Sequence, residues 1–144
     1  MPFVPRSAAC AAALTAVVAL PPAFAQDRTV PSSAGPIAVE TVADGLVHPW
    51  AIAFLPDGSA LLTERPGRLR HMGPEGELSA PIAGVPEVDA REQGGLLDVA
   101  PDPAFSDNRL VYLSYARPAG EERNSTAVAR GRLSEDLRRL VDVE

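Results

Sequence analysis

Cysteine, lysine and histidine are the residues that this sequence lacks or nearly lacks. Its one cysteine, Cys10, lies in the N-terminal apolar segment, and all 13 basic residues are arginines. The remainder of the chain therefore has no disulfide, no thiolate nucleophile and no cysteine ligand for a metal. The 19 acidic residues give a net charge of −6, and the basic residues form no patch. This composition argues against nucleic acid as a partner.

The N-terminal segment has the pattern of a secretory signal peptide. Arg6 precedes an apolar run from Ala8 to Leu20, and residues 23–25 read Ala-Phe-Ala. The run is shorter than the roughly 20 residues that a transmembrane helix needs. We therefore expect a signal peptide over residues 1–25, a mature chain without a membrane span, and a periplasmic or secreted location. A lipoprotein anchor at Cys10 is disfavoured, because this cysteine lies inside the apolar run.

The mature chain is predicted to be all-β. Residues 26–36 are polar, contain proline and lack periodicity, so we expect a flexible leader there and a folded domain over residues 37–144. Two β-hairpins are predicted around the turns Pro-Asp-Gly at 56–58 and Pro-Glu-Gly at 74–76. Proline presets the first turn angle and glycine supplies a positive φ.

A third hairpin and two further strands are predicted in the second half of the chain. The hairpin joins Leu96–Val99 to Leu110–Tyr115 through a proline-rich turn, Thr126–Leu133 alternate as a strand, and another strand starts at Leu140. No segment has the sustained period of an amphipathic helix. Similar strand–turn–strand units recur at an offset of roughly 45 to 50 residues, which is close to one propeller blade. A β-sandwich would show the same strand spacing, so the pattern leaves both architectures open.

The histidines and aspartates form no convincing catalytic or metal-binding set. His48 precedes a proline where a strand begins, a position at which a structural hydrogen bond is the common role, and His71 is expected to be exposed. No Ser-His-Asp set can be assembled, and Gly-x-Ser-x-Gly is absent. Asn124 starts an Asn-Ser-Thr glycosylation sequence, which has meaning only in a host that modifies it. Three aspartates lack the spacing of a calcium loop and are typical of turns, namely Asp98, Asp102 and Asp107.

Gln93 is the strongest candidate for contact with a ligand. It lies in the segment REQGGLLDVAPDPAF, residues 91–105, directly before Gly94 and Gly95. Its amide has two donors and an acceptor, which suit sugar hydroxyls, and the glycines leave room for a ligand to approach. A glutamine that caps a turn would stand in the same context. The residue chemistry therefore leaves a binding role and a structural role open.

Two motifs in this order carry a resemblance to a known family. HPWAIAFLPDGSALLTERPGRLR at 48–70 and REQGGLLDVAPDPAF at 91–105, followed by LVYLSYA, resemble the N-terminal part of the pyrroloquinoline-quinone (PQQ)-dependent aldose sugar dehydrogenases, the glucose/sorbosone dehydrogenase family. The resemblance covers nearly all of Val39 to Glu144. It implies the N-terminal part of a six-bladed β-propeller of four-stranded antiparallel blades. It also places Gln93 at the position of the glutamine that hydrogen-bonds the sugar.

The family's activity is the oxidation of an aldose to its lactone, with PQQ and calcium as cofactors and an external electron acceptor. In the family a histidine is the general base, within a motif resembling Asp/Asn-His-x-Gly-Gly-Arg-Leu. This sequence lacks that motif, and neither His48 nor His71 fits it. We therefore predict an enzyme but assign no catalytic, cofactor or metal residue. We expect the cofactor ligands to lie beyond residue 144 and the 144-residue chain alone to be inactive.

Two other interpretations stay open on the sequence. A non-enzymatic propeller module could use the same scaffold to bind a protein or a glycan, because fold does not determine function. A remnant of a propeller would expose blade edges, which favour aggregation.

Overall fold

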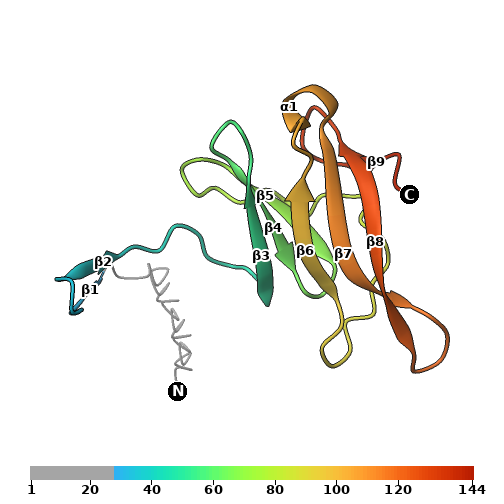
Figure 1. The fold of residues 1–144 in the computed structure, drawn as a ribbon, viewed down its shortest axis with the longest axis horizontal. Helices are drawn as coiled ribbons and strands as arrows, with labels where there is room; N and C mark the ends of the chain where they lie inside the picture. Colours follow the sequence, from blue (N-terminus) through green and yellow to red (C-terminus); the bar gives the residue numbers. More distant parts are fainter. Residues whose placement is uncertain (1–27) are drawn as a thin grey trace, which may run out of the picture. The chain divides into compact units, whose positions relative to one another are not determined.

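The structure is a computed structural model that describes residues 28–144 (Figure 1). The predicted signal peptide, residues 1–25, lies outside the described residues. The chain divides into two compact units, one ending at Val39 and the other covering Glu40–Glu144.

The first unit contains a short antiparallel hairpin in its described part. Strand β1, Arg28–Val30, pairs with β2, Ile37–Val39. The backbone N–H groups of Ser32 and Gly35 donate to each other's carbonyls, both at 3.2 Å, and close the turn. The structure differs here from the predicted leader over residues 26–36, because β1 lies within it. Three-residue strands are too short for an alternating pattern to be visible in the sequence.

The second unit begins with a three-stranded antiparallel sheet in the order β3-β4-β5. Its strands are β3 Pro49–Phe54, β4 Ala60–Glu64 and β5 Arg68–Met72. The predicted turn at 56–58 is confirmed, since the N–H of Gly58, at φ 86°, donates to the carbonyl of Leu55 at 3.0 Å. After the predicted turn at 74–76, the expected return strand is reduced to a single bridge between Met72 and Leu78.

A four-stranded antiparallel sheet follows in the order β6-β7-β8-β9. Its strands are β6 Leu96–Pro101, β7 Leu110–Pro118, β8 Asn124–Leu133 and β9 Leu140–Val141. These strands confirm the third predicted hairpin and both further strands. The proline-rich turn between β6 and β7 contains one turn of helix, α1 Phe105–Asn108, which ends where Arg109 takes a left-handed conformation. One turn is too short to show helical periodicity in the sequence.

The core of the second unit lies where the two sheets face each other. Strand β6 runs beside β3 and β4, and all three strands are visible together in Figure 1. Thr63 of β4 is fully buried and links the sheets, because its Oγ1 donates to the carbonyl of Leu97 in β6 at 2.5 Å. Burial of each large apolar side chain contributes about 1.5–3 kcal/mol. Those that are completely buried are Leu61, Leu69, Leu96, Val111, Leu113 and Leu133.

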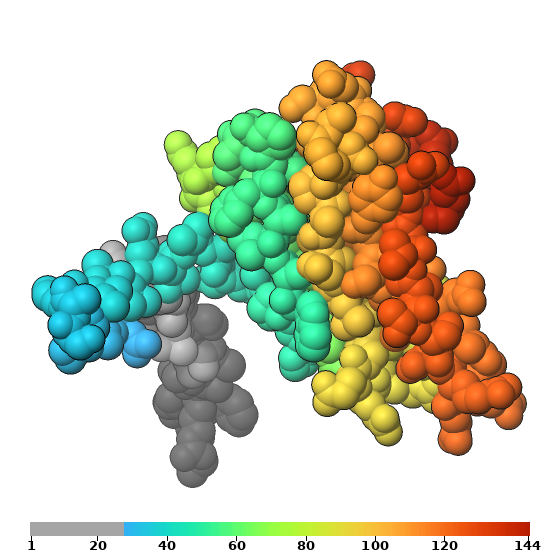
Figure 2. Space-filling view, in the orientation of Figure 1, coloured from blue at the N-terminus to red at the C-terminus, as the bar shows by residue number. Residues whose placement is uncertain are grey.

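On strand β3, the side chains that point away from this core are apolar and exposed. The alternate residues Trp50, Ile52 and Phe54 of β3 are 53%, 49% and 69% exposed. In the space-filling view β3 lies at the surface of the second unit, next to β6 (Figure 2). Val128 of β8, in the second sheet, is 68% exposed. Exposed apolar patches of this kind mark surfaces that pack against other protein, as the open faces of consecutive propeller blades do.

Candidate functional site

Gln93 lies in the turn that leads into β6, and its side chain is exposed. The turn is closed by the backbone, since the N–H of Gly94 donates to the carbonyl of Arg91 at 2.7 Å. Within residues 28–144 the amide of Gln93 has no hydrogen-bond partner. The turn therefore does not depend on the Gln93 side chain, and the amide is free to bind a ligand.

Arg65, in the turn between β4 and β5, contacts the Gln93 turn through its side chain. Its Nη1 donates to the carbonyls of Ala90 at 3.2 Å, Glu92 at 2.5 Å and Gly94 at 3.2 Å. Arg65 is not among the residues that the sequence predicts for the site. A signal was present, because Arg65 lies within the first family motif, but nothing in the sequence shows that it reaches a turn about 30 residues away.

Gly94 and Gly95 are required by the protein's own backbone. A Cβ atom built at Gly94 would lie 2.2 Å from the carbonyl oxygen of Asp89, and one at Gly95 would lie 2.2 Å from that of Arg65. Gly95 also has a φ of +133°, which favours glycine. Besides any room that they leave for a ligand, both glycines allow close packing. Gly94 packs against Asp89 and Arg91 of its own turn and against Ala116 of β7, and Gly95 packs against Arg65 in the β4–β5 turn.

Asp89 anchors the start of the same turn. Its buried carboxylate accepts hydrogen bonds from Nε of Arg91 at 2.9 Å, Nη2 of Arg91 at 2.6 Å and Nδ2 of Asn124 at 3.2 Å. The Arg91 hydrogen bonds, above all, hold the pKa of Asp89 well below its ordinary value. Asn124, which begins the Asn-Ser-Thr sequence, therefore connects β8 to the turn.

A polar depression of about 370 Å³ lies beside the turn. It is lined by Arg91, Glu92, Glu122 and Asn124, so charges of both signs and one amide face it. Polar side chains of this kind can hydrogen-bond a hydrated ligand such as a sugar. Glu92, which lines the depression, directly precedes Gln93 in the sequence.

His48 acts through its backbone. Its side chain is exposed, its φ is 49°, and its carbonyl accepts a hydrogen bond from the N–H of Arg65 at 3.0 Å. This hydrogen bond involves the backbone carbonyl, and within residues 28–144 the imidazole of His48 forms no hydrogen bond of its own. The backbone hydrogen bond connects the loop before β3 to the turn that carries Arg65.

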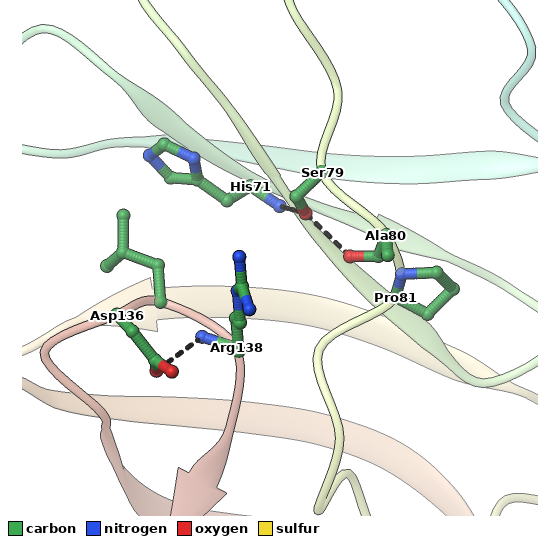
Figure 3. Close-up of a pocket in the computed structure, with 7 residues that line it drawn as sticks. His71, Ser79, Ala80, Pro81, Asp136 and Arg138 are labelled. Atoms are coloured by element: carbon green, nitrogen blue, oxygen red, sulfur yellow. Dashed lines mark hydrogen bonds between the residues drawn. The ribbon is translucent and has the colours of Figure 1, made fainter.

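His71 lies at a separate pocket of about 410 Å³, between β5 and the loop that joins β8 to β9 (Figure 3). It is half-buried rather than exposed as predicted, because the segment with Ser79 and Pro81 covers the edge of β5. Asp136 and Arg138 line the opposite side, and the N–H of Arg138 donates to Oδ1 of Asp136 at 3.1 Å. The two histidines therefore lie in different parts of the second unit.

Of the three aspartates, Asp102 lies at a turn as predicted, whereas Asp98 lies within strand β6 and Asp107 within α1. Asp102 accepts hydrogen bonds from Nδ2 of Asn108 at 2.9 Å and the hydroxyl of Tyr112 at 3.1 Å. These hydrogen bonds, that from Asn108 first, lower the pKa of Asp102. Within residues 28–144 no three His, Cys, Asp or Glu side chains converge as metal ligands.

Comparison with known proteins identifies the family. The family model described as glucose/sorbosone dehydrogenase matches residues 46–144. The chain belongs to the glucose/sorbosone dehydrogenase family. The match contains β3 to β9 and includes both Arg65 and Gln93, so the site described above lies within the family domain.

Individual relatives agree with this family. An aldose sugar dehydrogenase of Escherichia coli K12 is 50% identical over 105 residues, which are 72% of this chain and 28% of the relative. Quinoprotein glucose dehydrogenase B of Acinetobacter calcoaceticus is 35% identical over 78 residues, which are 52% of this chain and 16% of the relative. A crystal structure of a glucose dehydrogenase aligns with a TM-score of 0.69 and 53% identity, over 72% of this chain and 30% of that chain.

The fold of this glucose/sorbosone dehydrogenase domain is a partial β-propeller. Its second antiparallel sheet has the four strands predicted for a blade and its first sheet has three, and the predicted fold class is confirmed. The chain spans less than a third of the length of each relative given above. No helix in the described part of the chain is long and apolar enough to cross a membrane.

Proposed function

We propose that the protein containing this chain is a PQQ-dependent dehydrogenase that oxidises aldose sugars to lactones. The observation that carries the proposal is the exposed, unpartnered amide of Gln93, held on a rigid turn inside a domain of the sugar dehydrogenase family. An amide with donors and an acceptor matches a sugar hydroxyl, which both donates and accepts.

The role proposed for Gln93 is to bind and orient the sugar. Positioning of a substrate lowers the entropic cost of reaching the reactive geometry. The turn is suited to this role because Asp89 and Arg65 hold it from two sides, so binding does not have to order it.

PQQ is proposed as the cofactor because one relative is named a quinoprotein and the family includes aldose sugar dehydrogenases. When bound, it would accept the hydride of the sugar's anomeric carbon and pass the electrons to an external acceptor. Calcium is proposed by the same family resemblance. Residues 28–144 offer no cluster of metal ligands, so no ligand of calcium or PQQ and no general base is assigned to them.

A periplasmic or secreted location is part of the proposal. It is supported by the N-terminal sequence, in which Arg6, an apolar run and the Ala-Phe-Ala sequence at 23–25 form the pattern of a cleaved signal. N-terminal sequencing of the exported protein tests it, and a mature chain that starts at Gln26 is the expected result.

The activity is tested on the complete reading frame that contains this chain. The purified protein receives calcium and PQQ, and reduction of a redox dye is followed with glucose and other aldoses. Sustained turnover is expected, and Gln93→Met is expected to raise KM about tenfold, because a hydrogen bond to the substrate is worth roughly that factor. Ser106→Ala is the control, since this exposed hydroxyl on α1 lies outside the Gln93 turn.

Two outcomes would contradict the proposal. A protein that binds glycans or another protein but reduces no dye would be a non-enzymatic propeller module. Turnover by the 144-residue chain alone would show that the catalytic groups lie within it, contrary to our assignment.

A further inference from the structure

We infer that Arg65 is a positioning residue that sets the orientation of Gln93 toward the sugar. The inference rests on the proposed function of Gln93. Arg65 comes from a different turn than Gln93. Its side chain is inferred to affect substrate binding without contacting the substrate.

The first observation is the pattern of carbonyls around the guanidinium. Nη1 of Arg65 donates to the carbonyls of residues 90, 92 and 94, at 3.2, 2.5 and 3.2 Å. These three carbonyls flank Gln93 on both sides, so one charged group holds the whole turn. Hydrogen bonds from a charged donor are stronger than those between neutral groups.

The second observation is the strained backbone beside Gln93. Glu92 has a φ of 47°, in the left-handed region that residues other than glycine rarely adopt. Such a conformation persists only where neighbouring groups impose it. The carbonyl of Glu92 has the shortest of the three Arg65 contacts, so the guanidinium acts on the strained residue directly.

The third observation is that Arg65 is itself fixed. Its N–H donates to the carbonyl of His48 at 3.0 Å, and its carbonyl accepts from the N–H of Leu96 at 2.9 Å. The β4–β5 turn is closed by the N–H of Gly67, which donates to the carbonyl of Glu64 at 2.9 Å. The side chain thus reaches the Gln93 turn from a rigid base.

The fourth observation concerns the charge of Arg65. Within residues 28–144 its guanidinium takes part in no salt bridge, whereas Arg68 and Arg70 both pair with Glu64. All the hydrogen bonds formed by the Arg65 side chain go to the carbonyls of the Gln93 turn. The structure therefore gives this cation one function, which is to organise that turn.

The test is a double-mutant cycle in the complete, cofactor-loaded protein, with Arg65→Met, Gln93→Met and the double variant. Arg65→Met removes the donors and keeps a similar apolar stem. We expect it to raise KM for the aldose about tenfold with kcat changed less than about twofold, since a lost binding contact acts on KM. The KM of the double variant should be less than about twofold above that of Gln93→Met alone, because Arg65 acts on the substrate through Gln93.

A purely structural role would give a different result. A loss of folded protein would lower the apparent kcat and leave KM unchanged. Arg138→Met is the matched control, because it removes one exposed arginine from the β8–β9 loop, and it should change neither parameter. If Arg65→Met does not fold, Arg65→Lys replaces it in the same cycle, since lysine keeps the charge but not the planar fork of donors.

The outcomes separate this inference from the function on which it rests. If Gln93→Met raises KM but the Arg65 variants leave it unchanged, or if the two effects multiply, the positioning role is wrong and the role of Gln93 stands. If Gln93→Met itself leaves KM unchanged, the proposed sugar contact is wrong, and the inference fails with it.

Discussion

The buried carboxylate of Glu64 accepts two hydrogen bonds from the guanidinium of Arg68, from Nε to Oε2 and from Nη2 to Oε1, both at 2.8 Å. The same carboxylate accepts the N–H of Val47 at 2.5 Å. Glu64 ends β4 and Arg68 begins β5, so this pair closes the turn that carries Arg65. It also holds the segment that enters β3.

Removal of this carboxylate is predicted to destabilise the protein strongly. Glu64→Ala leaves the N–H of Val47 and the guanidinium of Arg68 without their partner, and leaving a buried donor unsatisfied costs about 1–3 kcal/mol. The measurement is the free energy of unfolding in denaturant. Glu77→Ala, at an exposed glutamate, is the control. A change of less than about 1 kcal/mol at Glu64 would place the pair among ordinary surface salt bridges.

Stability is predicted to fall in acid because of depressed carboxylate pKa values. Burial raises the pKa of Glu64, but hydrogen bonds from Arg68 and Val47 outweigh it and place the pKa below the ordinary value of 4.5. The Arg91 hydrogen bonds, with smaller contributions from other groups, lower the pKa of Asp89 below 3.8. A group whose pKa is lower in the folded state stabilises the fold above its unfolded pKa and loses this effect as pH falls through the folded value.

The resulting test follows the free energy of unfolding from pH 6 downward. It should be constant above roughly pH 5 and decline below about pH 4. Asp89→Asn should make the decline shallower, because one group that takes up a proton on unfolding is gone. An unchanged slope in Asp89→Asn would show that this carboxylate has the same pKa in both states.

Gly95→Ala is predicted to lower the free energy of unfolding far more than Gly58→Ala. Both glycines have a positive φ, +133° and +86°, but a Cβ at Gly95 would lie 2.2 Å from the carbonyl oxygen of Arg65, whereas nothing lies within 4 Å at Gly58. Gly58→Ala should cost about 1–2 kcal/mol from the backbone conformation alone. Gly95→Ala should cost roughly 2 kcal/mol more, since backbone must move. Equal costs, measured by chemical denaturation, would contradict the close contact.

The exposed face of β3 is predicted to drive association of the 144-residue chain. Trp50, Ile52 and Phe54 present an apolar stripe that further protein would cover in a closed propeller. Size exclusion should show assembly or aggregation, and the double variant Ile52→Thr and Phe54→Thr should reduce it. A compact, thermally cooperative monomer of the unmodified chain would contradict this prediction. Glu135→Thr, at an exposed polar position, should leave association unchanged.

Most of the second unit's strands could be predicted because their signals are local. The turn at 56–58 works through residues that are adjacent in sequence, and the alternation in β7 and β8 has a period of two residues. Strand β1 and the single turn of α1 escaped prediction, because neither is long enough to show a period. Family motifs, and not periodicity, distinguished a propeller from a sandwich and gave Gln93 its expected contact with the sugar.

The sequence by itself determined the all-β class, the main turns and the candidate amide at Gln93, since each depends on residues that are close together in the chain. Only the tertiary structure decided how that amide is held. The contact of Arg65 with the carbonyls of residues 90, 92 and 94 exists because β6 packs beside β4, and the same packing makes Gly95 necessary. Contacts between distant residues arise from the packing of sheets, and no local pattern in the sequence encodes their distances.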